Sequence, residues 1–146
     1  MFKFKLQSVL EYRLNVEEKI VGEYSEIRRR LETEKELLKA LIKEREGMLN
    51  ELRQVKSTIL RAQDIASRVS YIEAIRLKEL NQTNVIHEVA GLVESKRKEL
   101  VEAVKKRKVL ENLRDRQSEE YRKNMSDLEQ KNSDEMSVLK FGRRET

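Results

Sequence analysis

The sequence predicts an all-α protein, a long antiparallel two-helix coiled-coil hairpin, and three observations support this fold. Charged residues make up 40% of the 146 residues, with 32 Lys and Arg against 27 Asp and Glu. Proline is absent, so nothing forces a helix to stop. Apolar residues recur at heptad spacing, as in coiled coils. This composition leaves too little apolar material for a compact core with an enclosed pocket, and we therefore expect no enzyme.

The first helix is expected over about residues 3–63, because an apolar stripe runs along this segment. One set of heptad core positions comprises Ile20, Ile27, Glu34, Leu41, Met48, Val55 and Ala62. The other set comprises Tyr24, Leu31, Leu38, Arg45, Leu52, Ile59 and Ala66. Only Glu34 and Arg45 interrupt the stripe, which is as narrow as a coiled-coil seam.

A turn is expected at about residues 64–70, where Ser70 followed by Glu73 matches a capping box at a helix start. The second helix is then expected over about residues 71–140. Because a short connection makes neighbouring helices antiparallel, residues 1–146 would form a single hairpin domain. This turn would also bring Phe2 and Phe4 close to Phe141.

The second helix carries a weaker apolar stripe. Its members are Ile86, Val89, Val93, Leu100, Ala103, Leu110, Tyr121 and Leu128. Polar residues interrupt it at Lys96, Arg107, Arg114, Gln117 and Asn124. The far half of this seam is polar enough that a long dry interface is not expected there. Part of the hairpin could therefore pair only when a partner is present.

The net positive charge of the chain lies on one segment. Residues 96–123 hold eleven basic and six acidic residues, and the rest of the chain is balanced. A phosphate-binding track is one interpretation of this segment. A solvated helix face, or a face opposed to an acidic protein, is favoured because Glu99, Glu102, Glu111 and Asp115 would repel phosphate. Stacking aromatics are also scarce, and only Tyr121 lies nearby.

Residues suited to catalysis or metal binding are scarce. His87 is the only histidine, there is no cysteine, and no Gly-rich phosphate loop is present. We expect no catalytic residues, no metal and no cofactor. No apolar run reaches the roughly 20 residues that span a bilayer. The first five residues also lack the apolar core of a secretory signal, so a soluble cytoplasmic protein without membrane insertion is expected.

Both ends of the chain resemble one family. The opening segment, FKFKLQSVLEYR from Phe2 to Arg13, is similar to the start of the FliJ family of bacterial flagellar export proteins. The C-terminal half carries RKVLENL from Arg107, then Glu120-Tyr121, and then EQKNSDE from Glu129 to Glu135. This order is similar to the C-terminal signature of that family, and the resemblance covers essentially the whole chain.

The resemblance implies a non-enzymatic component of the flagellar type III export apparatus. The family fold is an antiparallel two-helix coiled coil that resembles the central stalk of rotary ATPases. The expected partners are the hexameric export ATPase FliI, the export-gate protein FlhA and export chaperones. The expected location is the cytoplasm, in peripheral association with the membrane-bound export apparatus.

The resemblance also suggests contact residues. For the ATPase these are Gln130, Lys131, Asp134 and Glu135, with Lys105 and Arg107 from the basic track as support. The alternative is that the first four only cap and solvate the last helical turns. For the export gate the candidates are Leu41, Met48, Tyr71 and Ile75. For Leu41 and Met48 a place in the seam is the favoured interpretation, whereas Tyr71 and Ile75 are expected to be exposed and are the better candidates.

Two other functions remain open from the sequence. One is a stalk or coupling subunit of another rotary ATPase or secretion system, which would share the hairpin. The other is a nucleic-acid-binding coiled-coil arm that uses the basic segment. Salt-dependent binding to DNA or RNA would favour the second of these.

Overall fold

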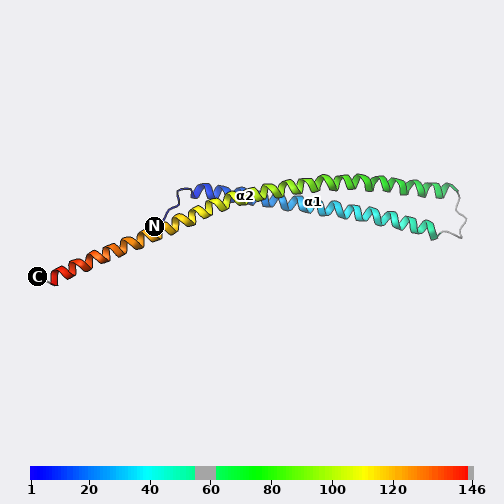
Figure 1. Ribbon diagram of the computed structural model, residues 1–146. Coiled ribbons are helices and arrows are strands. Elements are labelled where there is room, and N and C mark those ends of the chain that lie inside the picture. Colours follow the sequence, from blue (N-terminus) through cyan, green and yellow to red (C-terminus); the bar gives the residue numbers. More distant parts are fainter. Residues whose placement is uncertain (55–61, 145–146) are drawn as a thin grey trace. The chain divides into compact units, whose positions relative to one another are not determined.

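The computed structural model describes residues 1–54 and 62–144, and these residues form two long helices. Helix α1 spans Gln7–Gln54 and helix α2 spans Ala62–Arg144 (Figure 1). No strand occurs in the described part of the chain. The predicted all-α helical hairpin is therefore confirmed as a fold class.

The prediction of a turn at residues 64–70 is wrong, because these residues lie in the first turns of α2. Ser70 is consequently inside the helix and does not cap its start. Ala62 begins the helix instead, and Asp64 lies in its first turn, where a carboxylate interacts favourably with the helix dipole. Residues 55–61, which the first helix was expected to include, lie outside the described residues.

Contacts within the chain group into two units. One unit comprises Lys19–Leu100, and the other combines Met1–Glu18 with Val101–Thr146. In the first unit, Glu23 pairs with Lys96 and Arg45 pairs with Glu79. As the residue number rises along α1, that of its partner on α2 falls, so the two helices are antiparallel in this unit.

The second unit has the same antiparallel pairing, since Glu17 contacts Arg107 and the Met1 ammonium group contacts Tyr121. The distance from the Met1 nitrogen to the Tyr121 hydroxyl oxygen is 2.9 Å. The ring centroids of Phe2 and Tyr121 are 5.8 Å apart. These contacts fix where the N-terminal segment meets α2.

The buried residues lie along the seam and are few, as expected where only two helices share an interface. Phe4, Leu10 and Ala103 are buried in one unit. Ile72, Ile75 and Val89 are buried in the other. Most other seam residues are half-buried, so the polar contacts between the helices add to a thin apolar interface.

Helix α1 starts later than expected, at Gln7 rather than near residue 3. The Gln7 amide donates to the Phe4 carbonyl at 3.2 Å, and the Phe4 side chain is buried. Phe141 is 66% exposed, so the predicted cluster of three phenylalanines is wrong. The N-terminal segment instead meets α2 at Tyr121, twenty residues before Phe141.

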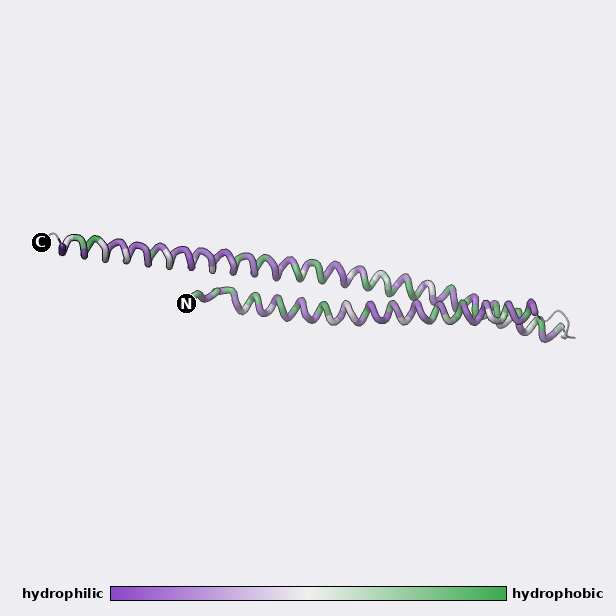
Figure 2. The backbone as a smooth tube through the Cα atoms, turned by 90° about the horizontal axis from the view of Figure 1, so that it is seen from below, coloured by the Kyte–Doolittle hydropathy of each residue, from purple (hydrophilic) through white to green (hydrophobic). Residues whose placement is uncertain are grey.

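The last part of α2 has no neighbouring helix. Every residue from 122 to 144 is exposed. Figures 1 and 2 show α2 continuing as a single helix past the N-terminus of the chain. We call residues 122–144 the C-terminal arm, and it is the longest stretch of helix whose surface is open on all sides in the described chain.

Candidate functional site: polar seam and contact surfaces

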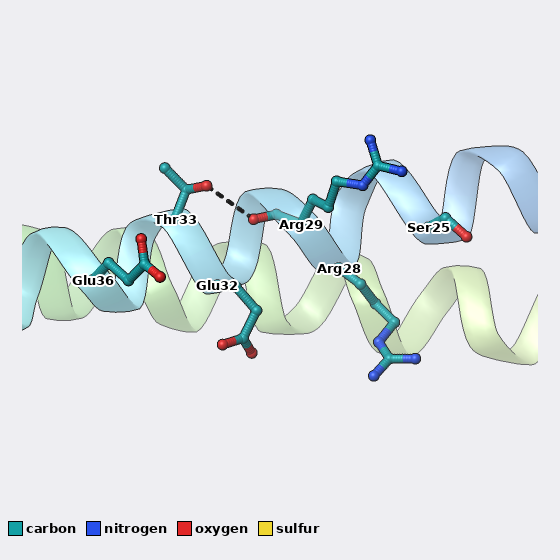
Figure 3. Close-up of a pocket in the computed structure, with 6 residues that line it drawn as sticks. All are labelled: Ser25, Arg28, Arg29, Glu32, Thr33 and Glu36. Carbon is teal, nitrogen blue, oxygen red and sulfur yellow. Dashed lines mark hydrogen bonds between the residues drawn. The ribbon is translucent and has the colours of Figure 1, made fainter.

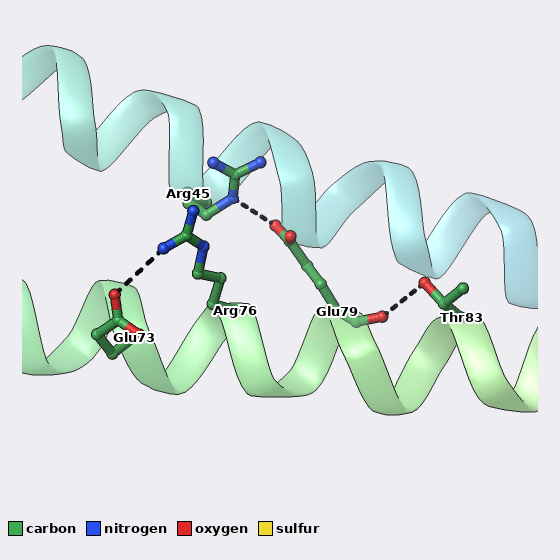
Figure 4. A network of polar contacts seen from close by, with 5 residues as sticks. All are labelled: Arg45, Glu73, Arg76, Glu79 and Thr83. Carbon is green, nitrogen blue, oxygen red and sulfur yellow. Dashed lines mark hydrogen bonds and ion pairs between the residues drawn. The ribbon is translucent and has the colours of Figure 1, made fainter.

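The seam between α1 and α2 contains a charged pair formed by Arg45 and Glu79. Arg45 Nε lies 2.8 Å from Glu79 Oε1, and the two side chains are 24% and 15% exposed (Figure 4). This hydrogen bond to the Glu79 carboxylate raises the pKa of Arg45. On the α2 side, the Thr83 hydroxyl donates to the Glu79 carbonyl at 2.9 Å. Arg45, which interrupts the apolar stripe of α1, therefore has a partner in the facing helix.

Glu34, the other interruption of that stripe, also has a partner on α2. The side-chain nitrogen Nε2 of Gln82 donates to the Glu34 carbonyl oxygen at 2.8 Å and to Glu34 Oε2 at 2.5 Å. One amide group thus satisfies both the backbone and the side chain of a seam residue. Polar layers of this kind specify the register of a coiled coil at some cost in stability.

Two basic interruptions of the α2 stripe are paired in the same manner. Lys96 contacts Glu23 of α1, and its Nζ lies 2.8 Å from Glu99 Oε2. The hydrogen bond from Lys96 lowers the pKa of Glu23, and the two carboxylates raise the pKa of Lys96.

Arg107 is the second basic interruption, and it lies between two carboxylates. Its guanidinium group donates to Glu17 of α1, and its Nη1 lies 2.8 Å from Glu111 Oε2. These hydrogen bonds raise the pKa of Arg107, with that to Glu17 making the larger contribution. Among the described residues no buried side-chain nitrogen or oxygen lacks a hydrogen-bond partner.

Four of the seven basic residues between positions 96 and 108 are paired with carboxylates of the chain. Besides Lys96 and Arg107, Arg97 Nη2 lies 2.7 Å from Glu94 Oε1, and Lys105 Nζ lies 3.5 Å from Glu102 Oε1. Carboxylates beside the basic groups weaken the attraction for phosphate. This arrangement fits an interaction with proteins better than a phosphate-binding track.

Three of the four residues predicted for the ATPase contact come together on the C-terminal arm. Lys131, Asp134 and Glu135 line one shallow surface pocket with Val138 and Leu139. Gln130 is exposed nearby on the same arm but does not line that pocket. The two supporting residues differ, since Lys105 is exposed whereas the Arg107 guanidinium is held in the seam.

The four residues predicted for the gate contact differ in their exposure. Ile75 is only 2% exposed, so the expectation that it is exposed is wrong. Tyr71 is exposed, and its hydroxyl donates to Glu44 Oε1 of α1 at 2.8 Å, which raises the pKa of Tyr71. Leu41 and Met48 are both half-buried, as seam residues of a two-helix interface are.

An exposed apolar face of α2 was missed by the sequence analysis. Val69, Leu77 and Leu80 are 45%, 64% and 60% exposed. Their spacing places them on one side of α2, turned away from the side that buries Ile72 and Ile75. The same spacing is present in the sequence, where it is not distinguished from the stripe that belongs to the seam. We call Val69, Leu77 and Leu80 the outer apolar face.

The surface also carries a shallow pocket on α1 that shows no catalytic arrangement. It is lined by Ser25, Arg28, Arg29, Glu32, Thr33 and Glu36 (Figure 3). All six residues are exposed, and the Thr33 hydroxyl donates to the Arg29 carbonyl at 3.0 Å. Within residues 1–54 and 62–144 no cluster of three or more His, Cys, Asp or Glu side chains could hold a metal ion.

No helix of the described segments is both long and apolar enough to cross a membrane. The fold and its surfaces thus define a coiled-coil protein with two exposed surfaces, the C-terminal arm and the outer apolar face. A family model described as flagellar FliJ protein matches residues 2–146, and the chain belongs to this family. The family is a non-catalytic component of flagellar export, so a role related to that process follows. Searches of curated proteins and of solved structures returned no match.

Proposed function

We propose that this protein is a stalk-like component of the flagellar export apparatus that binds the hexameric export ATPase FliI and promotes its assembly and ATP turnover. The observation that carries the proposal is the C-terminal arm, a helix exposed on every side. It combines the charges of Lys131, Asp134 and Glu135 with the apolar side chains of Val138 and Leu139. A lone helix of this kind can enter a ring, whereas a paired helix presents only one side to a partner.

Three charged residues of the arm are available for intermolecular pairs. Lys131, Asp134 and Glu135 make no ion pair among the described residues, and all three are exposed. Arg107 is excluded from the proposed contact surface because Glu17 and Glu111 already bind its guanidinium group. Lys105 remains accessible, although it pairs with Glu102. The arm, with Gln130, therefore makes the proposed contact.

For the export gate FlhA we propose the outer apolar face. Tyr71, whose hydroxyl group donates to Glu44 of α1, lies on another side of α2 and is a separate candidate. Exposed apolar side chains that share one side of a helix are a common docking surface for proteins. Leu77 and Leu80 are the most exposed members of this face. Ile75 would act indirectly, by packing α2 against α1. Contact with export chaperones and peripheral association with the membrane-bound apparatus are further parts of this proposal.

The proposal requires no cofactor and no catalytic residue in this chain. His87, the only histidine of the sequence, is exposed on α2. General acid–base catalysis depends on positioned groups whose pKa suits the reaction. The pairs described above instead join the two helices or neighbouring turns of one helix. The chain would thus regulate an ATPase without catalysing a reaction itself.

The proposed function can be tested with purified export ATPase. Adding the full chain should raise ATP turnover and promote ring assembly, and both effects should weaken with Lys131→Glu combined with Asp134→Lys. The matched control is Lys98→Glu combined with Glu88→Lys, which alters exposed charges elsewhere on α2. If the helical wild-type chain changes neither turnover nor assembly, the proposal is wrong.

Two other functions are less favoured. A stalk of a different secretion or rotary ATPase would share the fold, but the match to the flagellar family covers residues 2–146. A nucleic-acid-binding arm would need free basic groups, and four of the seven basic residues between positions 96 and 108 (Lys96, Arg97, Lys105 and Arg107) are paired. Binding to DNA that weakens steeply with salt would favour this last function.

A further inference from the structure

The C-terminal arm carries an apolar stripe that continues the side of α2 facing the N-terminal segment. Met125 and Leu128 follow Tyr121 by four and seven residues, so all three share one side of the helix. Phe2 and Met1 cover Tyr121. Beyond that point Met125, Leu128, Met136 and Leu139 are 42%, 53%, 59% and 63% exposed. The stripe thus extends the side of α2 that the N-terminal segment covers into a region where no helix of the described chain packs against it.

The spacing of the stripe is symmetric about Asn132. The intervals from Met125 through Leu128, Asn132 and Met136 to Leu139 are three, four, four and three residues. Met125 and Met136, like Leu128 and Leu139, are eleven residues apart, a period that keeps apolar residues on one side of an almost straight helix. A stripe that reads the same in both directions is suited to an antiparallel copy of itself.

We propose that two copies of this protein associate through their C-terminal arms, antiparallel and related by a twofold axis at Asn132. In this pairing Met125 faces Leu139 of the second copy, Leu128 faces Met136, and the two Asn132 side chains face each other. Such an interface is isologous, because both copies use the same surface. A facing pair of asparagines within an apolar seam also fixes register and orientation.

The charges beside the stripe support the same arrangement. Lys131 and Glu135 flank it on one side, and neither forms an ion pair among the described residues. With the axis at Asn132, Lys131 of one copy lies within two residues of Glu135 of the other, measured along the helices. Two attractive pairs thus form across the axis. A parallel in-register pairing would instead place Lys131 of one copy level with Lys131 of the other, where the two like charges repel each other.

The interface is small, with four apolar residues from each arm, so association in the micromolar to millimolar range is expected. The inference does not depend on the proposed function. Where both hold, the dimer and the ATPase complex exclude each other, because both use the C-terminal arm. The dimer would then hold the arm covered until a partner with higher affinity displaces the second copy.

Sedimentation equilibrium of the full chain over a range of concentrations tests the association. A reversible monomer–dimer equilibrium is expected, and Leu128→Glu should weaken dimerisation at least tenfold. Val138→Glu is the matched control, because Val138 is exposed on the same arm but lies off the stripe. A chain that stays monomeric up to millimolar concentration, or a dimer unaffected by Leu128→Glu, would overturn the proposal.

Engineered cysteines test the orientation, since the sequence contains no cysteine. Leu128→Cys mixed with Met136→Cys should form a mixed disulfide under mild oxidation. Each variant alone should crosslink poorly, because equal positions away from Asn132 are far apart in an antiparallel pair. Preferred crosslinking of Leu128→Cys to itself would overturn the antiparallel arrangement. Retained helicity of both variants, measured by circular dichroism, ensures that either outcome reports on the pairing.

Discussion

Arg45 Nε on α1 donates a hydrogen bond to Glu79 Oε1 on α2 at 2.8 Å, in the middle of a seam that is otherwise mostly apolar. Both side chains are largely covered by the two helices. A charged pair in such a place contributes little net stability compared with apolar residues, but removing one member leaves the other without compensation. The main effect of the pair is therefore on the register of the two helices, that is, on which residues face each other.

We expect Arg45→Leu alone to lower the melting temperature, because it leaves the Glu79 carboxylate in the seam without its partner. The double variant Arg45→Leu with Glu79→Leu should melt above the single variant, at or above the wild type. Thermal unfolding followed by circular dichroism measures both. A double variant that is less stable than the wild type would mean that the pair contributes more than apolar packing does.

The Glu23–Lys96 pair makes the stability of the protein depend on pH in the acidic range. The hydrogen bond from Lys96 lowers the pKa of Glu23 below the unfolded value of about 4.3. A lowered folded-state pKa means that the stabilisation is fully present above the unfolded pKa and is lost as the pH falls through the folded pKa. Unfolding curves between neutral pH and strongly acidic pH should therefore show a smaller loss of stability for Glu23→Gln. Equal pH dependence of the two proteins would contradict this assignment.

Gly91 lies inside α2, and a methyl group added there would meet no atom within 4 Å. Since glycine costs about 1 kcal/mol relative to alanine within a helix, Gly91→Ala should stabilise the protein by up to about that amount. Chemical denaturation provides the measurement. Gly47→Ala on α1 offers a second site with the same open surroundings. Destabilisation by alanine at both sites would contradict the prediction that only helix propensity matters at these positions.

The outer apolar face should be separable from the seam by mutation. Leu80→Asp should abolish binding to the gate protein without lowering helicity, because Leu80 is 60% exposed. Ile75→Ala should instead cost on the order of 2 kcal/mol of stability, since Ile75 is buried between the helices. Pull-down with the purified gate protein, alongside thermal melting, distinguishes the two effects. Unchanged binding of Leu80→Asp would remove this face from the proposed gate contact.

The fold class and most of the seam could be predicted because heptad spacing reports directly on the side of a helix that is buried. Glu34 and Arg45 were correctly placed on that side, but their partners, Gln82 and Glu79, depend on register, which the sequence pattern alone does not determine. The error at Ser70 has a related cause. A capping box also occurs within helices, and only tertiary structure shows where the chain turns.

The contact surfaces were less predictable than the seam. Because the turn was placed too late in the sequence, the expected partner of the N-terminal segment was Phe141, twenty residues beyond Tyr121, which is the residue contacted. The C-terminal arm therefore appeared to be part of a paired hairpin. Its exposure follows from the unequal lengths of α1 and α2, which are 48 and 83 residues.

The most direct test of the account compares the full chain with a chain that ends at Arg122 in an assay of the export ATPase. The shortened chain retains the contacts of Arg107 with Glu17 and of Phe2 with Tyr121, so its helices should still pair. We predict that the full chain raises ATP turnover and that the shortened chain, with helicity in proportion to its length, does not. Equal stimulation by both chains would contradict the assignment of the C-terminal arm as the ATPase contact.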